Sequence, residues 1–180
     1  MATRAVFLDR DGVLNANLVR DNRPYAPRRL HEFRLLPGVE EAVQRIKAAG
    51  FLAIVITNQP DVADGITPRA TVDAFHAELL RSMPLDDIKI CFHNNADQCT
   101  CRKPLPGLIL EAAAERDIDL AASYLVGDRW RDIKAGQAAG CHSIFIEYGF
   151  KQDEAIAPDA VVKSLPEAVS YILNRVEKRN

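Results

Sequence analysis

Short apolar runs alternate with longer segments of helical periodicity along most of this chain. The apolar runs are strand-sized, and they fall at residues 5–8, 51–56, 88–92, 123–126 and 143–147. Apolar positions recur at helical spacing over residues 39–49, 69–82, 107–116, 130–139 and 165–176. Such alternation is typical of a parallel sheet with helices on both faces. The pattern therefore predicts an α/β fold with a doubly wound, Rossmann-like sheet.

Residues that favour helix ends mark several of these boundaries. Gly50 and Gly140 follow two of the predicted helices, where glycine commonly adopts the left-handed cap conformation. Thr67 and Pro68 precede the helix over 69–82, and we expect them to form its cap and first turn. The sequence has no internal repeat, low-complexity tract or linker, so residues 1–180 are expected to form one domain.

Polar residues follow several of the predicted strands, where a doubly wound sheet binds its ligands. They are Asp9 and Asp11 after the first strand, Thr57, Asn58 and Gln59 after the second, and Gly127, Asp128 and Arg129 after the fourth. Arg102 and Lys103 precede another helix and are expected to reach the same crevice. Each set alone also fits an ordinary loop or helix cap. Their joint pattern predicts a single polar site.

Asp9 and Asp11 are the strongest candidates for chemistry within that site. Alternate side chains share a face in an extended segment, and Gly12 lets the backbone turn away beneath the pair. Aspartate is a known nucleophile in phosphoryl transfer through an aspartyl-phosphate, while a second carboxylate handles protons. The pair therefore favours phosphoryl transfer, and the alternative interpretation is a solvated turn at a strand end.

Composition limits the partners and the location. The chain of 180 residues is 48% hydrophobic, which is enough for a sizeable core. A net charge of −2 gives no electrostatic reason to expect nucleic acid or an anionic membrane as partner. The apolar runs are far shorter than a membrane-spanning helix needs, and residues 1–4 lead into the first strand without the apolar region of a signal peptide. We therefore expect a cytoplasmic, reducing location.

Three of the four cysteines lie between positions 91 and 101, which in a reducing compartment indicates metal binding more than disulfides. Cys91, His93, Cys99 and Cys101 form a closed Cys₃His set that suits structural zinc. Zinc there would fix the polar loop over residues 94–98; the alternative is a set of reduced thiols. The sequence offers no partner for the remaining groups: Cys141 is expected to be a small buried hydrophobe, and His31, His76 and His142 are assigned no role.

Four motifs resemble those of the haloacid dehalogenase superfamily. They are Asp9-Arg10-Asp11-Gly12-Val13, Thr57-Asn58, Lys103, and Gly127-Asp128 through Asp132-Ile133. Within the superfamily, Thr57-Asn58-Gln59, Cys101-Arg102-Lys103-Pro104 and the cysteine/histidine loop resemble the histidinol-phosphate and D-glycero-D-manno-heptose 1,7-bisphosphate phosphatase group. The likeness extends from about residue 5 to residue 147.

The resemblance implies a role for each motif residue. Asp9 would be the nucleophile, and Asp11 would protonate the leaving oxygen and later deprotonate water, which requires it to be protonated when substrate binds. Mg²⁺ would be held by the Asp9 carboxylate, the Asp11 backbone carbonyl and the Asp128 carboxylate. Asp132 would orient a ligand of the metal, or it is a simple helix-start carboxylate. The phosphoryl oxygens would contact Thr57, Asn58 and Lys103, and the rest of the substrate would contact Gln59, Arg102 and Arg129.

Substrate identity depends on the loops around the site. The stretch between Asn15 and Pro37 is too short for a separate cap domain, and it carries Arg20, Arg23, Arg28, Arg29 and Arg34, which would contact an anion or form a solvated basic surface. After Gln59, the heptose-bisphosphate enzymes continue with Ser-Gly-Ile-Ala-Arg-Gly, whereas this chain has Asp64 at the position of the arginine. That exchange replaces an anion contact with a repulsive carboxylate.

Three functions from different classes fit the sequence. The favoured one is a Mg²⁺-dependent phosphatase of a small phosphorylated metabolite, either removing the 7-phosphate of heptose 1,7-bisphosphate or acting on histidinol phosphate. The second is a nucleic-acid 3′-phosphatase, which the net charge and the lack of an interleaved basic and aromatic face disfavour. The third is a zinc-stabilised binding module without catalysis. A monomer is expected.

Overall fold

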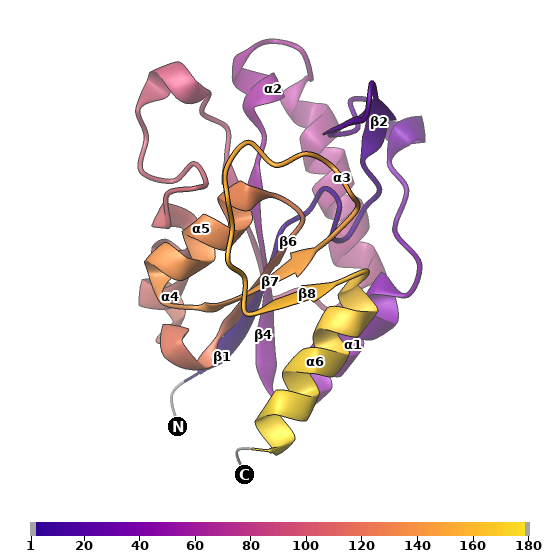
Figure 1. Cartoon of the computed structure of the whole chain (residues 1–180). Coiled ribbons are helices and arrows are strands. Elements are labelled where there is room, and N and C mark those ends of the chain that lie inside the picture. The colour runs from indigo at the N-terminus through magenta and orange to yellow at the C-terminus, as the bar shows by residue number, and fades with distance from the viewer. Residues whose placement is uncertain (1–2, 179–180) are drawn as a thin grey trace.

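The computed structural model describes residues 3–178 and contains a six-stranded, fully parallel sheet in the order β5-β4-β1-β6-β7-β8 (Figure 1). The strands are β1 (Arg4–Leu8), β4 (Phe51–Asn58), β5 (Asp87–Cys91), β6 (Tyr124–Gly127), β7 (His142–Ile146) and β8 (Ala160–Val162). β1 pairs in parallel with both β4 and β6 and so lies inside the sheet. The predicted doubly wound α/β fold is confirmed.

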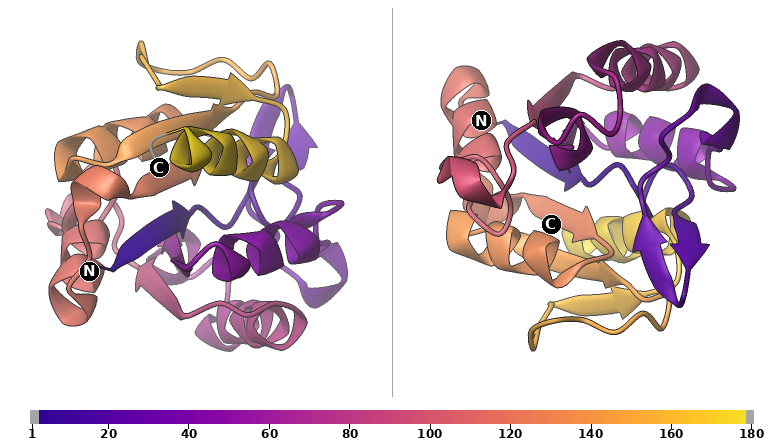
Figure 2. Two further views of the ribbon diagram at one scale, coloured as in Figure 1. Left: turned by 90° about the horizontal axis from the view of Figure 1, so that it is seen from below. Right: turned by 90° about the horizontal axis from the view of Figure 1, so that it is seen from above.

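Helices cover both faces of the sheet, as Figure 2 shows. One face carries α1 (Val39–Ala48), α3 (Arg69–Ser82) and α6 (Leu165–Glu177), and the other carries α4 (Gly107–Arg116) and α5 (Trp130–Ala139). Alternation along β1 supplies both cores, because Val6 and Leu8 pack with the first group while Ala5 and Phe7 pack with the second. Packing on both faces therefore fixes the direction of β1 and the position of Asp9, which follows it.

Most predicted boundaries agree with the structure to within a residue or two. The main difference is that β4 extends to Asn58, so Thr57 and Asn58 lie in the strand and not after it. The backbone of both residues pairs with β5. Their polar side chains gave no sign in the sequence that the strand continues to Asn58. Thr67 was wrongly expected to cap α3: Pro68 occupies the cap position, and the buried Thr67 hydroxyl has no hydrogen-bond partner among the described residues.

Several short elements were not predicted. They are the antiparallel hairpin of β2 (Leu18–Arg20) and β3 (Arg23–Tyr25), the single helical turn α2 (Pro60–Ala63), the edge strand β8, and the 3₁₀ turns η1 (Leu30–Glu32), η2 (Asn95–Asp97) and η3 (Leu120–Ala122). Asp21 and Asn22 turn the hairpin with φ of 49° and 58°, a conformation these two residue types tolerate well. Elements of three or four residues carry too little periodicity to be recognised from a sequence.

The hairpin, α2 and the cysteine/histidine loop all lie at the edge of the sheet where its strands end, at the top of Figure 1. A doubly wound sheet binds ligands at this edge. Away from it, Cys141 is buried, as expected. Within residues 3–178, no helix is long and apolar enough to cross a membrane. Met1 and Ala2, part of the segment expected to lack the apolar region of a signal peptide, lie outside the described residues.

Candidate active site

A buried ion pair forms the floor of the site. Asp9 lies directly after β1, and its Oδ1 accepts a hydrogen bond of 2.8 Å from Lys103 Nζ. The same ammonium donates to the Ile56 carbonyl at 2.9 Å and pairs with Asp132 Oδ1 at 2.7 Å. Burial lowers the pKa of Lys103, but the charges of Asp132 and Asp9 outweigh it and raise that pKa above its ordinary value. Lys103 is therefore a fixed positive charge at the cavity floor.

Asp9, Asp128 and Asp132 form an acidic cluster in which one carboxylate oxygen from each residue lies within 4.8 Å of the other two. Burial and the charge of Asp132 raise the pKa of Asp9 to about 7 against the opposing effect of Lys103, and burial and the Asp9 charge raise the pKa of Asp128. Asp128 Oδ2 accepts a bond of 2.8 Å from Asn17 Nδ2, while the buried Oδ1 has no partner among the described residues. The cluster has the charge and the oxygen donors that a hard cation needs.

Gly12 allows the turn after β1 to approach this cluster closely. A Cβ atom at position 12 would lie 2.2 Å from Asp128 Oδ2, and the residue has a φ of +84°. Both features exclude any residue with a side chain without rearrangement.

Of the two interpretations of Asp132, the structure confirms the helix-start carboxylate, while a role beside a metal ion stays a prediction. Its Oδ2 accepts a bond of 3.0 Å from the Arg129 amide and so caps α5. Its Oδ1 faces Lys103 within the acidic cluster. Asp132 therefore begins α5 with one oxygen and pairs with Lys103 through the other.

Asp11 lines the cavity but does not join the acidic cluster. Its carboxylate accepts from Arg10, from Asn15 Nδ2 at 2.9 Å and from Gln59 Nε2 at 2.9 Å. Burial raises the pKa of Asp11, but the Arg10 guanidinium and these hydrogen bonds outweigh it and lower the pKa below its usual range. This arrangement favours the ionised form, whereas the acid role expected for Asp11 requires the protonated form.

The residues at the end of β4 support the site in different ways. Asn58 brackets the backbone of Lys103, donating from Nδ2 to its carbonyl at 3.0 Å and accepting from its amide at 3.1 Å. Thr57 is fully buried, accepts from Gln59 Nε2 at 2.8 Å, and is not part of the cavity wall. Asn58 and Gln59 do line the cavity.

The cavity has a volume of about 290 Å³ and a basic rim. Arg102 donates to Asn95 Oδ1 at 3.0 Å and to the His93 carbonyl at 3.1 Å, and Arg129 donates to the Pro24 carbonyl at 2.8 Å. Arg131, which the sequence did not single out, completes the rim. Burial and the neighbouring charge of Arg102 lower the pKa of Arg131. The rim thus concentrates positive charge beside the entrance.

The β2–β3 hairpin forms part of the cavity wall through residues 24–26. Arg28, beyond the hairpin, pairs with Asp61 of α2 at 2.8 Å, so one of the five arginines in this stretch holds the hairpin region to α2. Asp64 does not line the cavity; it accepts a bond of 3.0 Å from Asn94. The charge exchange noted at position 64 therefore lies outside the cavity wall.

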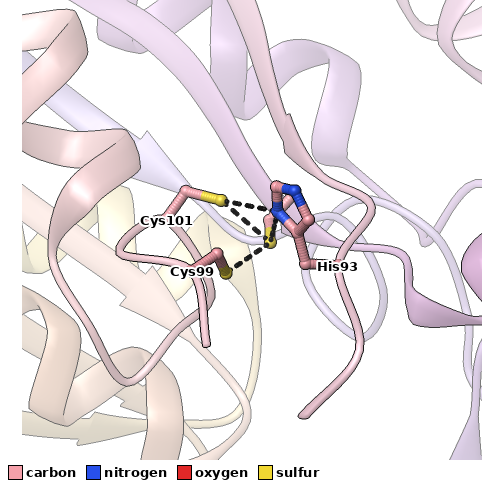
Figure 3. Close-up of side chains that lie close together, drawn as sticks. His93, Cys99 and Cys101 are labelled. Carbon is pink, nitrogen blue, oxygen red and sulfur yellow. Dashed lines mark hydrogen bonds between the residues drawn. The ribbon is translucent and has the colours of Figure 1, made fainter. Parts of the chain in front are cut away.

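Cys91, His93, Cys99 and Cys101 converge in a second cluster, in which the labelled side chains of Figure 3 point toward one another. Cys91 Sγ lies 3.7 Å from Cys99 Sγ and 3.1 Å from Cys101 Sγ, and His93 Nδ1 lies 3.2 Å from Cys101 Sγ. Thiolates bound to one tetrahedral zinc at ~2.3 Å would be about 3.8 Å apart. All four cysteines are free, and this cluster could hold a metal ion.

Neither Asn17 nor Arg10 was predicted to take part in the site. Arg10 lay within the nucleophile motif, so its position was a usable signal. Asn17 gave none, because nothing in the sequence connects it to Asp128, which lies far along the chain.

A doubly wound sheet with a buried aspartate after a central strand, a lysine beside it and further aspartates within reach defines a hydrolase of the haloacid dehalogenase type. Residues 100–168 match the family described as HAD-hydrolase-like. The chain is 36% identical over 151 residues to the D-glycero-beta-D-manno-heptose-1,7-bisphosphate 7-phosphatase of Bordetella bronchiseptica, covering 81% of this chain and 82% of that protein. It is 33% identical to the D-glycero-D-manno-heptose-1,7-bisphosphate 7-phosphatase of Thermosynechococcus vestitus, covering 99% of this chain and 100% of that protein.

A solved structure agrees with these sequence relatives. The D,D-heptose 1,7-bisphosphate phosphatase of B. bronchiseptica, crystallised with magnesium and phosphate, superposes with a TM-score of 0.81 at 30% identity and covers 96% of this chain and 99% of that one. The chain belongs to the haloacid dehalogenase superfamily, in its heptose-1,7-bisphosphate 7-phosphatase family. The resemblance inferred from the motifs is confirmed, and the protein is a phosphatase.

Proposed function

We propose that this chain is a Mg²⁺-dependent phosphatase that removes the 7-phosphate of D-glycero-D-manno-heptose 1,7-bisphosphate through an aspartyl-phosphate. The observation that carries the proposal is the Asp9 carboxylate at the cavity floor, bonded at 2.8 Å to a buried lysine. Two relatives with that printed activity, matched over 82% and 100% of their length, support this choice of substrate.

The hydrogen bonds of Asp9 select the oxygen that attacks. Oδ1 accepts from Lys103 Nζ and from the Arg10 amide, both at 2.8 Å. Among residues 3–178 no hydrogen bond to Oδ2 is found, so that oxygen is free to attack phosphorus. The new bond joins Oδ2 to phosphorus as the bond to the sugar oxygen breaks. Lys103 offsets the negative charge of the phosphoryl group during this step.

Asp11 is the proton carrier for both halves of the reaction. It gives a proton to the departing sugar oxygen, and it takes one from the water that cleaves the aspartyl-phosphate. The dianionic phosphate brings negative charge beside Asp11, which favours binding of the proton that the acid role needs. To take up that proton, one Asp11 carboxyl oxygen must also lose a hydrogen bond that Arg10, Asn15 or Gln59 donates to it.

The acidic cluster fits Mg²⁺. The unpartnered buried Oδ1 of Asp128 lacks a positive neighbour that a cation would supply, and the raised pKa of Asp9 and Asp128 reflects the same shortage of positive charge. The carboxylates of Asp9 and Asp128 and the backbone carbonyl of Asp11 would hold the ion, with Asp132 beside them. When bound, Mg²⁺ supplies neutralisation of charge on the phosphoryl oxygens.

The thiol and imidazole donors of the second cluster suit structural zinc. Three sulfurs and one nitrogen fill a tetrahedral site and leave no position for substrate. The loop closed in this way carries Arg102, which is bonded to the loop at Asn95 and His93. Zinc would thereby hold Arg102 toward the part of the substrate that does not react.

Phosphate release would test this function directly. A panel holding both anomers of heptose 1,7-bisphosphate, histidinol phosphate, other sugar phosphates and a 3′-phosphorylated oligonucleotide is assayed with Mg²⁺ and with EDTA. We expect Mg²⁺-dependent release from one heptose anomer at a kcat/KM well above all other compounds. A preference for histidinol phosphate or for the oligonucleotide would replace the substrate and keep the chemistry. Release that EDTA leaves unchanged would contradict the metal assignment.

A further inference from the structure

The guanidinium of Arg10 is buried beneath the cavity and bonded on two sides. Toward the cavity, Nη2 donates to both oxygens of Asp11 at 2.9 Å, and Nε donates to Oδ1 at 3.2 Å. Away from the cavity, Nη1 lies 3.2 Å from His76 Nε2, and Cζ lies 5.4 Å from the centre of the Phe75 ring. Because arginine carries only donors, His76 Nε2 must be the acceptor.

His76 comes from a different layer of the molecule than the motifs. It lies on α3, whose buried positions Val72, Phe75 and Leu79 pack into the core, and its own exposed fraction is only 6%. Burial, and secondarily the charge of Arg10, lower the pKa of His76 to about 4. The ring is therefore neutral at pH 7 and has a lone pair on Nε2 for Arg10.

We infer that His76 is a positioning residue for proton transfer, because it anchors the Arg10 guanidinium and thereby sets the direction of the Asp11 carboxylate toward the leaving oxygen. The inference rests on the proposed function. Arg10 is tied to the core through His76 at one end and contacts both Asp11 oxygens at the other. A proton carrier must lie within hydrogen-bond reach of the atom that it serves, so a guanidinium without its anchor leaves the carboxyl group poorly directed.

Substrates whose leaving groups differ in basicity distinguish a loss of proton transfer from a general loss of activity. A sugar oxygen must be protonated as it departs, whereas p-nitrophenolate leaves without a proton, and kcat/KM reports only the steps through the first bond cleavage. In His76→Phe, which has no acceptor, we expect kcat/KM for the heptose bisphosphate to fall about 10-fold or more, and that for p-nitrophenyl phosphate to fall less than about 3-fold. His76→Gln retains an acceptor, and we expect it to recover most of the loss.

His31→Phe is the matched control, since it makes the same exchange at an exposed histidine outside the cavity wall. Thermal unfolding identifies variants that fold, and His76→Leu replaces His76→Phe if the latter does not. Equal losses on both substrates, equal rates for the Gln and apolar variants, or no loss at all would each overturn the inference while leaving the proposed function intact. A wild-type protein that releases no phosphate from any compound would instead overturn the proposed function, and the inference with it.

Discussion

The acidic cluster and the cysteine/histidine cluster both gather ligands for a cation, but the fold builds them in different ways. Asp9, Asp128 and Asp132 are buried, and they follow two central strands and begin a helix. In the second cluster only Cys91 belongs to a strand and is fully buried, while the other three ligands lie on a loop and are partly or largely exposed.

This difference matches the two roles proposed for the clusters, catalysis for the acidic cluster and support of a loop for the cysteine/histidine cluster. Three buried carboxylates beside one lysine leave excess negative charge. This charge opposes folding and favours the binding of a cation. The loop over residues 94–98 buries no apolar side chain, so packing contributes little to its order. The packed core therefore forms the first cluster, whereas packing contributes little to the loop of the second, where the proposed zinc would add most to stability.

The strongest test of the acidic cluster is Asp9→Asn. Because the amide is not a nucleophile, we expect kcat to fall by a factor on the order of 10⁴ or more, with the melting temperature unchanged or raised by removal of a buried charge. Steady-state phosphate release and calorimetry measure both. Asp73→Asn, at an exposed position on α3, should retain full activity. Full activity in Asp9→Asn would refute the nucleophile assignment.

Asp11→Asn sharpens the division of labour between the first two aspartates. We expect kcat to fall by about 10² to 10⁴, because proton transfer is lost. Mg²⁺ affinity should change little, since the backbone carbonyl of Asp11 is the expected ligand and the side chain lies outside the acidic cluster. Titration calorimetry with Mg²⁺ alone checks this point. A lost Mg²⁺ site would mean that the carboxylate itself helps to bind the ion.

Removing a thiol tests whether the second cluster stabilises its loop. We expect Cys101→Ser to purify without zinc, to unfold with about 3 kcal/mol less free energy, and to lose roughly 10-fold in kcat/KM because Arg102 is no longer held. Zinc content and denaturant unfolding are the measurements. Cys141→Ser is the matched control, since this thiol is buried away from the cluster and should leave zinc content unchanged. Wild-type protein without zinc would contradict the metal assignment.

The smallest expected effect concerns His76, the buried histidine that contacts Arg10. The pKa of His76 is about 4 in the folded protein and about 6.5 when unfolded, so the unfolded chain binds more protons between these values. The stabilising contribution is fully present above pH 6.5 and is lost as pH falls toward 4, at no more than ~1.4 kcal/mol per pH unit. The free energy of unfolding in urea, measured at pH 7, 6 and 5, should therefore depend less on pH for His76→Gln than for wild type. Parallel curves would contradict a buried neutral ring.

Long periodic segments and local motifs were readable before folding. The helices over residues 69–82, 107–116 and 130–139 have the predicted ends, because their apolar faces and their flanking Gly and Pro residues are local signals. Asp9, Lys103 and Asp128 meet as expected, since each follows or precedes an element that ends at the same edge of the sheet. His76 was assigned no role, because its burial on α3 and its contact with Arg10 appear only in the folded structure.

The order of the elements, the edge of the sheet at which polar groups gather, and the chemical type of the site follow from residues close together in the chain. The contacts of Asn58 with the Lys103 backbone, of Asn17 with Asp128, and of Arg10 with both Asp11 and His76 could be found only in the folded molecule. The two kinds of interaction differ in their range along the chain. Periodicity and capping act within a few residues, whereas these hydrogen bonds join residues whose separation in the chain closes only when both faces of the sheet are packed.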